Sequence, residues 1–494
     1  MKTVLRSLLL LFVMLSQLAA QDFKKLDTFI EKGMKDWQMP GFSVAIVKND
    51  SVIYAKGFGV TELGKEGKVD ENTLFVIASL SKAFTTASIA RLVDQGKLKW
   101  DDPVIKYLPD FQMYDPWVTK EISIRDLVTH RSGLVTFSGD ILWLGSNYDT
   151  KEVLRRSRYL KPVSSFRTKY GYSNLMYTAA GAVLEAVTDT SWQNYIKENF
   201  FKPLGMKRSV TSITELQKSS NIAKAYKMDG GKLSVIKYYS VDAVAPAAGI
   251  NSSAIEMAQW IRLQLGKGKY EGKRIFSERQ SAEMWMNHFA IGNGAIGLGW
   301  FADYYKGKRV LSHGGGMPGM VSNVTLVPEE KFGFVLLSNL ENSMTSAVRS
   351  YIMDLMLGLE EKDYNTEMLK RFNAGMERRQ KEFDRRDSIR VKNTTPSLPL
   401  EKYTGIYEDK MYGKAEVSVK DGSLFLQFLP SKEFRGELKH YHYDTFTIDW
   451  ADQFLTKGWV KFEMDFDADI EKFTIEVPNS PDFVFTELEF IKEK

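Results

Sequence analysis

Ser79 and Lys82 are the pair of side chains in this sequence best placed for nucleophilic chemistry. They open a segment with an apolar stripe, 79–95, which predicts a helix that ends at Gly96. Residues three apart on a helix share a face, so the amine can take the hydroxyl proton. Free N–H groups at the helix start would favour a developing negative charge. The alternative is an N-cap serine beside a surface lysine.

The same Ser-x-x-Lys spacing occurs a second time, at Ser234 and Lys237. That copy follows Asp229-Gly230-Gly231 in strand-like surroundings, where residues three apart face opposite sides. We therefore expect only the first pair to react. The pattern alone is weak evidence, because a chain of 494 residues contains chance matches to it.

A tyrosine and an asparagine two positions apart, Tyr172 and Asn174, form a second candidate group. Of the 22 tyrosines only this one has that spacing to an asparagine, in a turn that starts at Gly171 before a predicted helix over 176–187. A tyrosine near a lysine ammonium ionises more easily and can act as a second base, and the Asn174 amide can hold a substrate carbonyl. The alternative is a turn with a buried aromatic ring and an N-cap.

Three consecutive glycines, Gly314, Gly315 and Gly316, follow His313 in strand-like sequence. Glycines beside a strand let a substrate backbone come close and leave N–H groups that can bind an oxyanion. His313 is either a structural core histidine or a residue of the cleft, and its position before the glycines favours the cleft.

Three motifs in this order resemble those of the serine β-lactamase and penicillin-binding-protein superfamily, class C branch: Ser79-x-x-Lys82, Tyr172-x-Asn174 and His313-Gly314-Gly315. That group contains class C β-lactamases, DD-peptidases, D-aminopeptidases and β-lactamase-like esterases of the peptidase S12 type. The stretches 122–134, 203–206 and 297–300 also fit, and the resemblance covers residues 23–358. Residues 400–494 are similar to the lipocalin-like barrel often appended to such proteins.

The resemblance implies a role for each motif residue. Ser79 would be the acylated nucleophile, Lys82 and Tyr172 would share the proton transfers, and Asn174 would contact the substrate amide. The backbone N–H groups of Ser79 and Gly316 would form the oxyanion hole.

Two positions depart from the lactam-hydrolysing members of the group. His313 stands where those enzymes carry Lys, and Gly314 where they carry Thr. Lys and Thr help to bind the carboxylate of a β-lactam or a peptide C-terminus. An imidazole that titrates near about 6.5 would give a weaker, pH-dependent contact.

We therefore expect an exported serine hydrolase that forms an acyl-enzyme from an amide, ester or lactam. D-amino-acid peptides or small acyl esters are favoured over β-lactams as substrates. One alternative is an acyltransferase that uses the same acyl-enzyme, and another is a non-catalytic penicillin-binding sensor or scaffold.

The elements that must position these residues read as an α+β domain over 21–358: an antiparallel sheet flanked by helices, plus an all-helical subdomain. An amphipathic helix over 23–37 precedes this sheet, whose first and last strands are expected side by side. The predicted strands are 42–47, 52–54, 322–327 and 332–337.

A densely charged segment, 359–399, reads as a solvated helical linker ending in a Pro-containing stretch. After this segment the sequence pattern predicts short strands with alternating apolar residues, and Asp421-Gly422 is typical of a hairpin turn. Residues 400–494 are therefore expected to form a small antiparallel β-barrel.

Residues 1–20 read as a signal peptide, with Lys2 and Arg6 before the apolar run 8–15 and small residues over 16–20. We expect a bacterial periplasmic or secreted protein without a membrane span after cleavage. The chain has no cysteine, which excludes disulfides, thiol nucleophiles and cysteine-based zinc sites. No metal or cofactor is expected, and a net charge of +5 is too mild to indicate nucleic acid. The sequence leaves the oligomeric state open.

Overall fold

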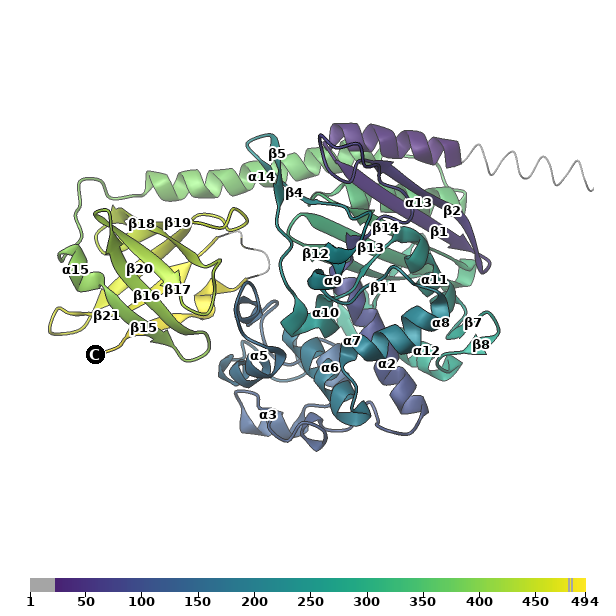
Figure 1. Cartoon of the computed structure of the whole chain (residues 1–494), viewed down its shortest axis with the longest axis horizontal. Helices are drawn as coiled ribbons and strands as arrows, with labels where there is room; N and C mark the ends of the chain where they lie inside the picture. Colours follow the sequence, from purple (N-terminus) through teal and green to yellow (C-terminus); the bar gives the residue numbers. More distant parts are fainter. Residues whose placement is uncertain (1–22, 479, 481–482) are drawn as a thin grey trace, which may run out of the picture.

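A computed structural model describes residues 23–478, 480 and 483–494. The chain forms two bodies that a long helix joins (Figure 1). The larger body holds a sheet with helices on both faces, and the smaller body is a closed β-barrel. The expected signal peptide, residues 1–20, lies outside the described residues.

Eight antiparallel strands form the central sheet, in the order β2-β1-β14-β13-β12-β11-β10-β9. The first strands therefore pair with the last ones, with Val44 opposite Leu336, as the sequence predicted. The strands are β1 Gly41–Lys48, β2 Ser51–Gly59, β9 Phe289–Ile291, β10 Gly294–Ile296, β11 Phe301–Tyr305, β12 Lys308–Met317, β13 Met320–Val327 and β14 Phe332–Ser338.

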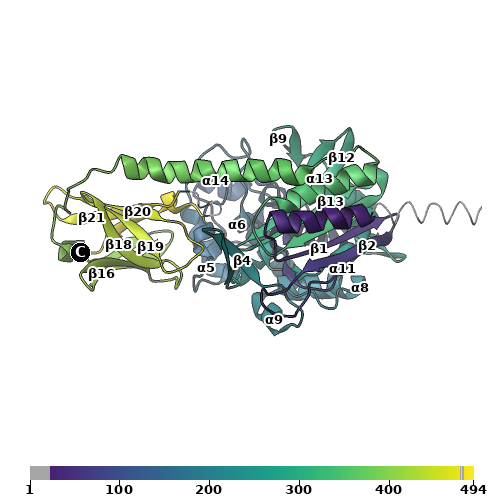
Figure 2. The same cartoon turned by 90° about the horizontal axis from the view of Figure 1, so that it is seen from above.

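Strand β1 is buried on both of its faces, and alternate residues enter two separate cores. Ala45 packs on the face that α11 (Ala254–Leu265) covers. Val44 packs on the opposite face, under helix 23–36 and α13 (Met344–Leu357), which lie side by side in Figure 2. This double burial explains why apolar residues occupy four successive positions, 44–47, rather than alternate ones.

The chain between β2 and β9 is mainly helical, and most of its helices lie below the sheet in Figure 1. Three small two-stranded sheets interrupt it: β3 Phe75–Val76 with β6 Asn251–Ser252, β4 Ala225–Asp229 with β5 Lys232–Ile236, and β7 Lys269–Tyr270 with β8 Lys273–Arg274. The helices are α2 Ser81–Asp94, α3 Pro116–Glu121, α4 Ile124–Val128, α5 Thr150–Arg156, α6 Asn174–Thr188, α7 Trp192–Ile196, α8 Lys202–Leu204, α9 Ile213–Lys218, α10 Ala245–Ala248 and α12 Glu278–Trp285.

Helix α14 (Tyr364–Ser388) is the helix expected in the charged segment, and it runs from the larger body to the barrel (Figures 1 and 2). Its 25 residues span about 38 Å. Met368 and Phe372, one turn apart, pack on the core beneath helix 23–36, while most other side chains are exposed. The first half of the helix therefore packs on the larger body. In the second half, Phe383 stacks on Trp459 of the barrel and Arg386 forms an ion pair with Glu476.

The C-terminal strands form a closed eight-stranded antiparallel barrel, as predicted. Its interior is aromatic, with Tyr403 and Tyr407 each in edge-to-face contact with Phe462. No helix within the described residues is long and apolar enough to cross a bilayer. The barrel elements are α15 Leu400–Tyr403, β15 Gly405–Asp409, β16 Gly413–Lys420, β17 Ser423–Phe428, β18 Arg435–His442, β19 Thr445–Trp450, β20 Gly458–Met464, β21 Ile470–Glu476 and β22 Glu489–Lys492.

Candidate active site

Ser79 lies in a 3-10 turn, η1 (Ala78–Leu80), that leads directly into α2. Ala78 has a φ of 47°, a left-handed conformation that is strained for a residue with a Cβ. The α-helix itself starts two residues later than the predicted 79–95. Lys82 nevertheless lies one turn after Ser79, and its Nζ is 3.2 Å from Ser79 Oγ.

The Lys82 amine is fully buried, although it belongs to a residue type that is usually exposed. Besides Ser79 Oγ, Nζ contacts two acceptors, Asn174 Oδ1 at 2.6 Å and the Ala247 carbonyl at 3.0 Å. Burial lowers the pKa of Lys82 to about 7, against the opposing charge of Asp140. A neutral amine donates to the two acceptors and turns its lone pair to the Ser79 hydroxyl, so Lys82 can act as a base near neutral pH.

Tyr172 lies next to this pair, and its hydroxyl hydrogen-bonds to Ser79. Lys82 Nζ lies over the Tyr172 ring, 4.7 Å from its centroid, and His130 stacks on the same ring at 4.4 Å. Burial raises the pKa of Tyr172 well above its usual value. The prediction that this tyrosine ionises easily is therefore wrong, because desolvation outweighs the hydrogen bond with Ser79, which lowers the pKa. Tyr172 is a protonated hydroxyl that can donate and relay.

The Asn174 amide is held at both ends by protein groups. Ser173 caps α6, so Asn174 becomes its first residue, two positions before the predicted start. The amide oxygen accepts from Lys82, and Nδ2 donates to Asp140 Oδ2 at 2.6 Å. Asp140 is buried in a 3-10 turn, η3 (Asp140–Leu142). The side-chain amide of Asn174, which was expected to contact a substrate amide, is thus already hydrogen-bonded to Lys82 and Asp140.

Strand β12 brings the glycine run against the turn that carries Ser79. Gly314 and Gly316 are exposed, and a Cβ added at Gly316 would meet nothing within 4 Å. Gly315 is buried, and an added Cβ would lie 2.2 Å from the Ile77 carbonyl oxygen and 2.3 Å from Ser322 Oγ. A glycine at this position lets β12 approach η1 closely.

Replacing Gly315 with Ala should therefore separate β12 from η1, destabilising the fold by about 1–3 kcal/mol. Neither Gly315 nor Gly316 has a positive φ, so the effect comes from packing alone. Gly316→Ala is the matched control, since its Cβ enters open space. Denaturant unfolding of both variants checks this, and equal midpoints would contradict the packing argument.

His313 lies beneath the glycines rather than at an exposed rim, and only 3% of it is exposed. Its Nδ1 is 2.6 Å from the Gly314 carbonyl oxygen, and its ring packs 5.1 Å from Phe301. Burial and the neighbouring Lys82 charge lower the pKa of His313 to about 3. The prediction of titration near 6.5 is wrong, because a second cation beside Lys82 in a desolvated site is disfavoured. His313 presents a neutral imidazole to the site.

In the second Ser-x-x-Lys copy, the lysine is paired with carboxylates of the barrel. Ser234 is exposed on the β4–β5 hairpin, and the Lys237 ammonium bonds to the carboxylates of Glu433 and Asp452 in the barrel. This agrees with the expectation that only the first pair can react.

Asp140 and His130 were not among the predicted site residues. His130 lies within the stretch 122–134, and its Nδ1 accepts from Ser173 N at 3.0 Å. Asp140 follows Gly139 in a loop with no recognisable pattern, and only the fold brings it to Asn174. No group of three or more His, Asp or Glu suited to a metal ion occurs in the part of the chain that the structure describes.

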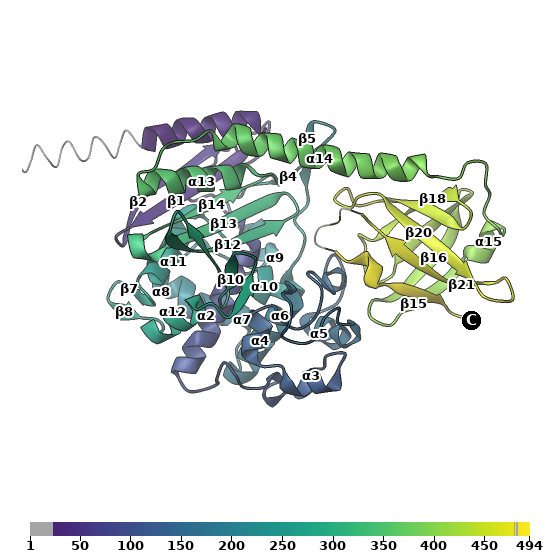
Figure 3. The same cartoon turned by 180° about the vertical axis from the view of Figure 1, so that it is seen from behind.

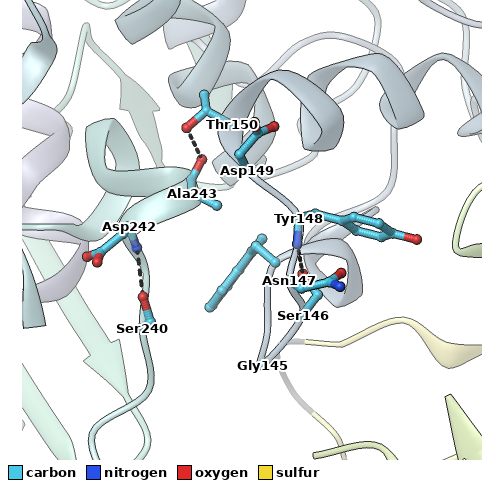
Figure 4. Close-up of a pocket in the computed structure, with 10 residues that line it drawn as sticks. Gly145, Ser146, Asn147, Tyr148, Asp149, Thr150, Ser240, Asp242 and Ala243 are labelled. Carbon is cyan, nitrogen blue, oxygen red and sulfur yellow. Dashed lines mark hydrogen bonds between the residues drawn. The ribbon is translucent and has the colours of Figure 1, made fainter. Parts of the chain in front are cut away.

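A cavity of about 360 Å³ lies between the segment after η3 and the loop before α10 (Figure 4). Its walls come from the two stretches that also support Lys82, one leading from Asp140 and one leading to Ala247. Thr150 Oγ1 bonds to the Ala243 carbonyl at 3.0 Å across the top of the cavity. The lining residues are Trp143, Gly145, Ser146, Asn147, Tyr148, Asp149, Thr150, Ser240, Asp242 and Ala243.

Comparison with known proteins bears on the family and the fold of the chain. A family model described as Beta-lactamase matches residues 26–355, and a model described as a domain of unknown function, DUF3471, matches 389–492. The Unguisins hydrolase ungD' of Aspergillus campestris is 27% identical over 422 residues, which cover 79% of this chain and 76% of that protein. Protein flp of Staphylococcus aureus is 28% identical over 328 residues, 65% of this chain and 63% of flp.

The fold has a solved counterpart in an octameric penicillin-binding protein homologue from Pyrococcus abyssi. Its TM-score is 0.63 at 23% identity, and the match covers 95% of this chain and 100% of that one. The shared architecture therefore extends over both bodies.

Proposed function

This chain belongs to the beta-lactamase family, and on that premise we propose that it is an exported serine hydrolase that cleaves esters or amides through an acyl-enzyme on Ser79. The observation that carries the proposal is the setting of Lys82. Its Nζ faces Ser79 Oγ at 3.2 Å, while its other contacts are acceptors that hold a neutral amine in place. Such an amine activates a serine without a histidine.

In the first step Lys82 takes the hydroxyl proton as Ser79 Oγ bonds to the substrate carbonyl carbon. The tetrahedral anion collapses, the bond to the leaving alcohol or amine breaks, and the proton on Lys82 passes to that group through the Tyr172 hydroxyl. Water then adds to the acyl-enzyme and gives its proton to the same groups. The acid departs and Ser79 regains its proton.

The oxyanion would be bound by the backbone N–H groups of Ser79 and Gly316. Two facts support this assignment: Gly315 holds β12 against η1, and the space beside Gly316 is open. Donors fixed by a strand and a turn do not have to reorganise when the charge develops.

The neutral His313 and the glycine at 314 favour esters or small amides over β-lactams. The position that carries a cation in lactam-hydrolysing relatives here holds an uncharged imidazole, so a substrate carboxylate gains no ion pair from it. We therefore propose a small acyl ester or a D-amino-acid amide as the substrate class.

A substrate panel tests this function: p-nitrophenyl esters of short acids, D-amino-acid amides and nitrocefin, each with and without an added alcohol or amine acceptor. Turnover of an ester or amide should exceed that of nitrocefin. Faster nitrocefin turnover would overturn the substrate class, and transfer to the acceptor would identify an acyltransferase. Stoichiometric acylation without turnover would identify a penicillin-binding sensor. The intact mass of the exported protein also reports whether residues 1–20 are removed.

A further inference from the structure

The barrel sends one carboxylate into the larger body. Glu487 lies in a 3-10 turn, η8 (Phe485–Glu487), just before the last barrel strand. It accepts two hydrogen bonds from the larger body, one from the Ser138 hydroxyl and one from Gly139 N at 2.9 Å. Figure 3 shows this end of the barrel facing α5 and the loops around it.

The residues that Glu487 holds are the two that directly precede Asp140. Asp140 Oδ2 accepts from Asn174 Nδ2, and Asn174 Oδ1 accepts from Lys82 Nζ, each at 2.6 Å. A continuous path of hydrogen bonds and one short turn therefore leads from the barrel to the amine beside Ser79.

Other contacts between the bodies lie close to this path. Trp143, the C-terminal cap of η3, packs edge-on against Phe483 with ring centroids 5.9 Å apart, and Asn147 N donates to the Pro430 carbonyl at 2.9 Å. Tyr239 OH donates to Asp452 at 2.6 Å, and Arg156 Nη1 donates to the Met411 carbonyl at 2.8 Å. These bonds hold the barrel in place from the α5 side and from the loop after β5. Glu487 differs from them because it is a carboxylate that accepts hydrogen bonds from the two residues directly before Asp140.

A buried carboxylate is costly unless strong hydrogen bonds stabilise it. Burial raises the pKa of Glu487, and the bonds from Ser138 and Gly139 counteract that rise. Gly139 has a φ of 74°, and an added Cβ would lie 2.6 Å from Leu175 Cδ1, so the turn has little room to move toward the core. With Glu487 on its other side the turn is fixed from both directions.

We propose that Glu487 is a positioning residue of the active site, which the barrel supplies to hold the 138–140 turn and, through Asp140 and Asn174, the Lys82 amine against Ser79. This inference rests on the proposed function of Ser79 and Lys82. It assigns the barrel a part in catalysis as well as in architecture.

Loss of Glu487 should change the electrostatics of the site in a specific direction. Asp140 raises the pKa of Lys82 against burial, so a turn that relaxes away leaves the amine easier to deprotonate. On the barrel side, Asp409 is the charged neighbour that faces Glu487. The titratable groups around Lys82 are Asp140, His130, His313, Tyr172 and Tyr177.

The test measures the rate of covalent labelling by a fluorophosphonate against pH, on the full chain. Glu487→Ala should lower the plateau rate roughly 10- to 100-fold, because a displaced amine no longer faces Ser79. The acid limb, which is the rise in rate as Lys82 loses its proton, should move to lower pH. Glu487→Gln can still accept from Gly139 N and bond to Ser138, so it should retain most of the rate. Tyr239→Phe is the matched control, since it loosens the same interface without touching the turn.

The outcomes distinguish failure of this inference from failure of the proposed function. A Glu487→Ala profile equal to wild type, or a loss that Tyr239→Phe shares without a shifted limb, would overturn the inference. Wild type that takes no label would overturn the proposed function instead. If Glu487→Ala does not fold, Ser138→Ala removes one of the two bonds and should show a smaller loss with the same direction of shift.

Discussion

Ser79→Ala should abolish covalent labelling by a fluorophosphonate and all turnover, while the fold stays intact. The substitution removes the oxygen that the Lys82 amine and the Tyr172 hydroxyl both contact. Loss of a catalytic serine costs on the order of 10⁶-fold in other serine hydrolases. Because Ser79 is only half-buried and the change removes one atom, the unfolding midpoint should hardly move. Intact mass spectrometry should show one adduct on wild type and none on the variant.

Ser234→Ala is the natural control for this prediction. It removes the other serine with a lysine three positions on, at an exposed hairpin site. This variant should label like wild type, with the adduct on the peptide that contains Ser79. An adduct that persists in Ser79→Ala, or that maps to Ser234, would show that the nucleophile is assigned to the wrong residue.

The sequence predicted best what depends on local pattern. β1 and β14 are apolar runs bounded by turns, so their positions and their pairing could be expected. The Ser79–Lys82 contact could be expected too, because one helical turn is enough to bring the two side chains together. The short alternating strands and the hairpin at Asp421-Gly422 were sufficient to predict the barrel.

What the sequence could not predict depends on contacts between distant segments. Asp140 meets Asn174 across 34 positions, and Glu487 meets Ser138 across 349. Asn174 belongs to a motif, but no pattern marks Asp140 as its partner, or Ser138 and Glu487 as a pair. The pKa values of Tyr172 and His313 were misjudged for a related reason. A pattern can indicate that a cation is near, but not that α2, α6 and β12 together exclude water from both rings.

Activity should rise with pH through about 7 and then stay level to at least pH 9, with Lys82 as the group that titrates. Burial lowers the pKa of Lys82 to about 7, so the amine is charged and inactive as a base below that pH and neutral above it. His130 and His313 titrate well below their usual range, and the pKa of Tyr172 lies well above 10, so none of them accounts for a limb near 7. A profile of kcat/KM for a neutral ester measures this limb.

Two substitutions test whether Lys82 is the group that causes the rise in kcat/KM near pH 7. Lys82→Ala should lower kcat/KM by about 10²–10⁴-fold and remove the limb, because the base is gone. Tyr172→Phe should lower the plateau but keep the limb near 7, since the ring over Lys82 remains and only the hydroxyl bonded to Ser79 is lost. The double variant should be little worse than the worse single one, because both groups handle the same proton. A limb that survives in Lys82→Ala would show that another group is the base, and fully additive losses would place the two residues in separate steps.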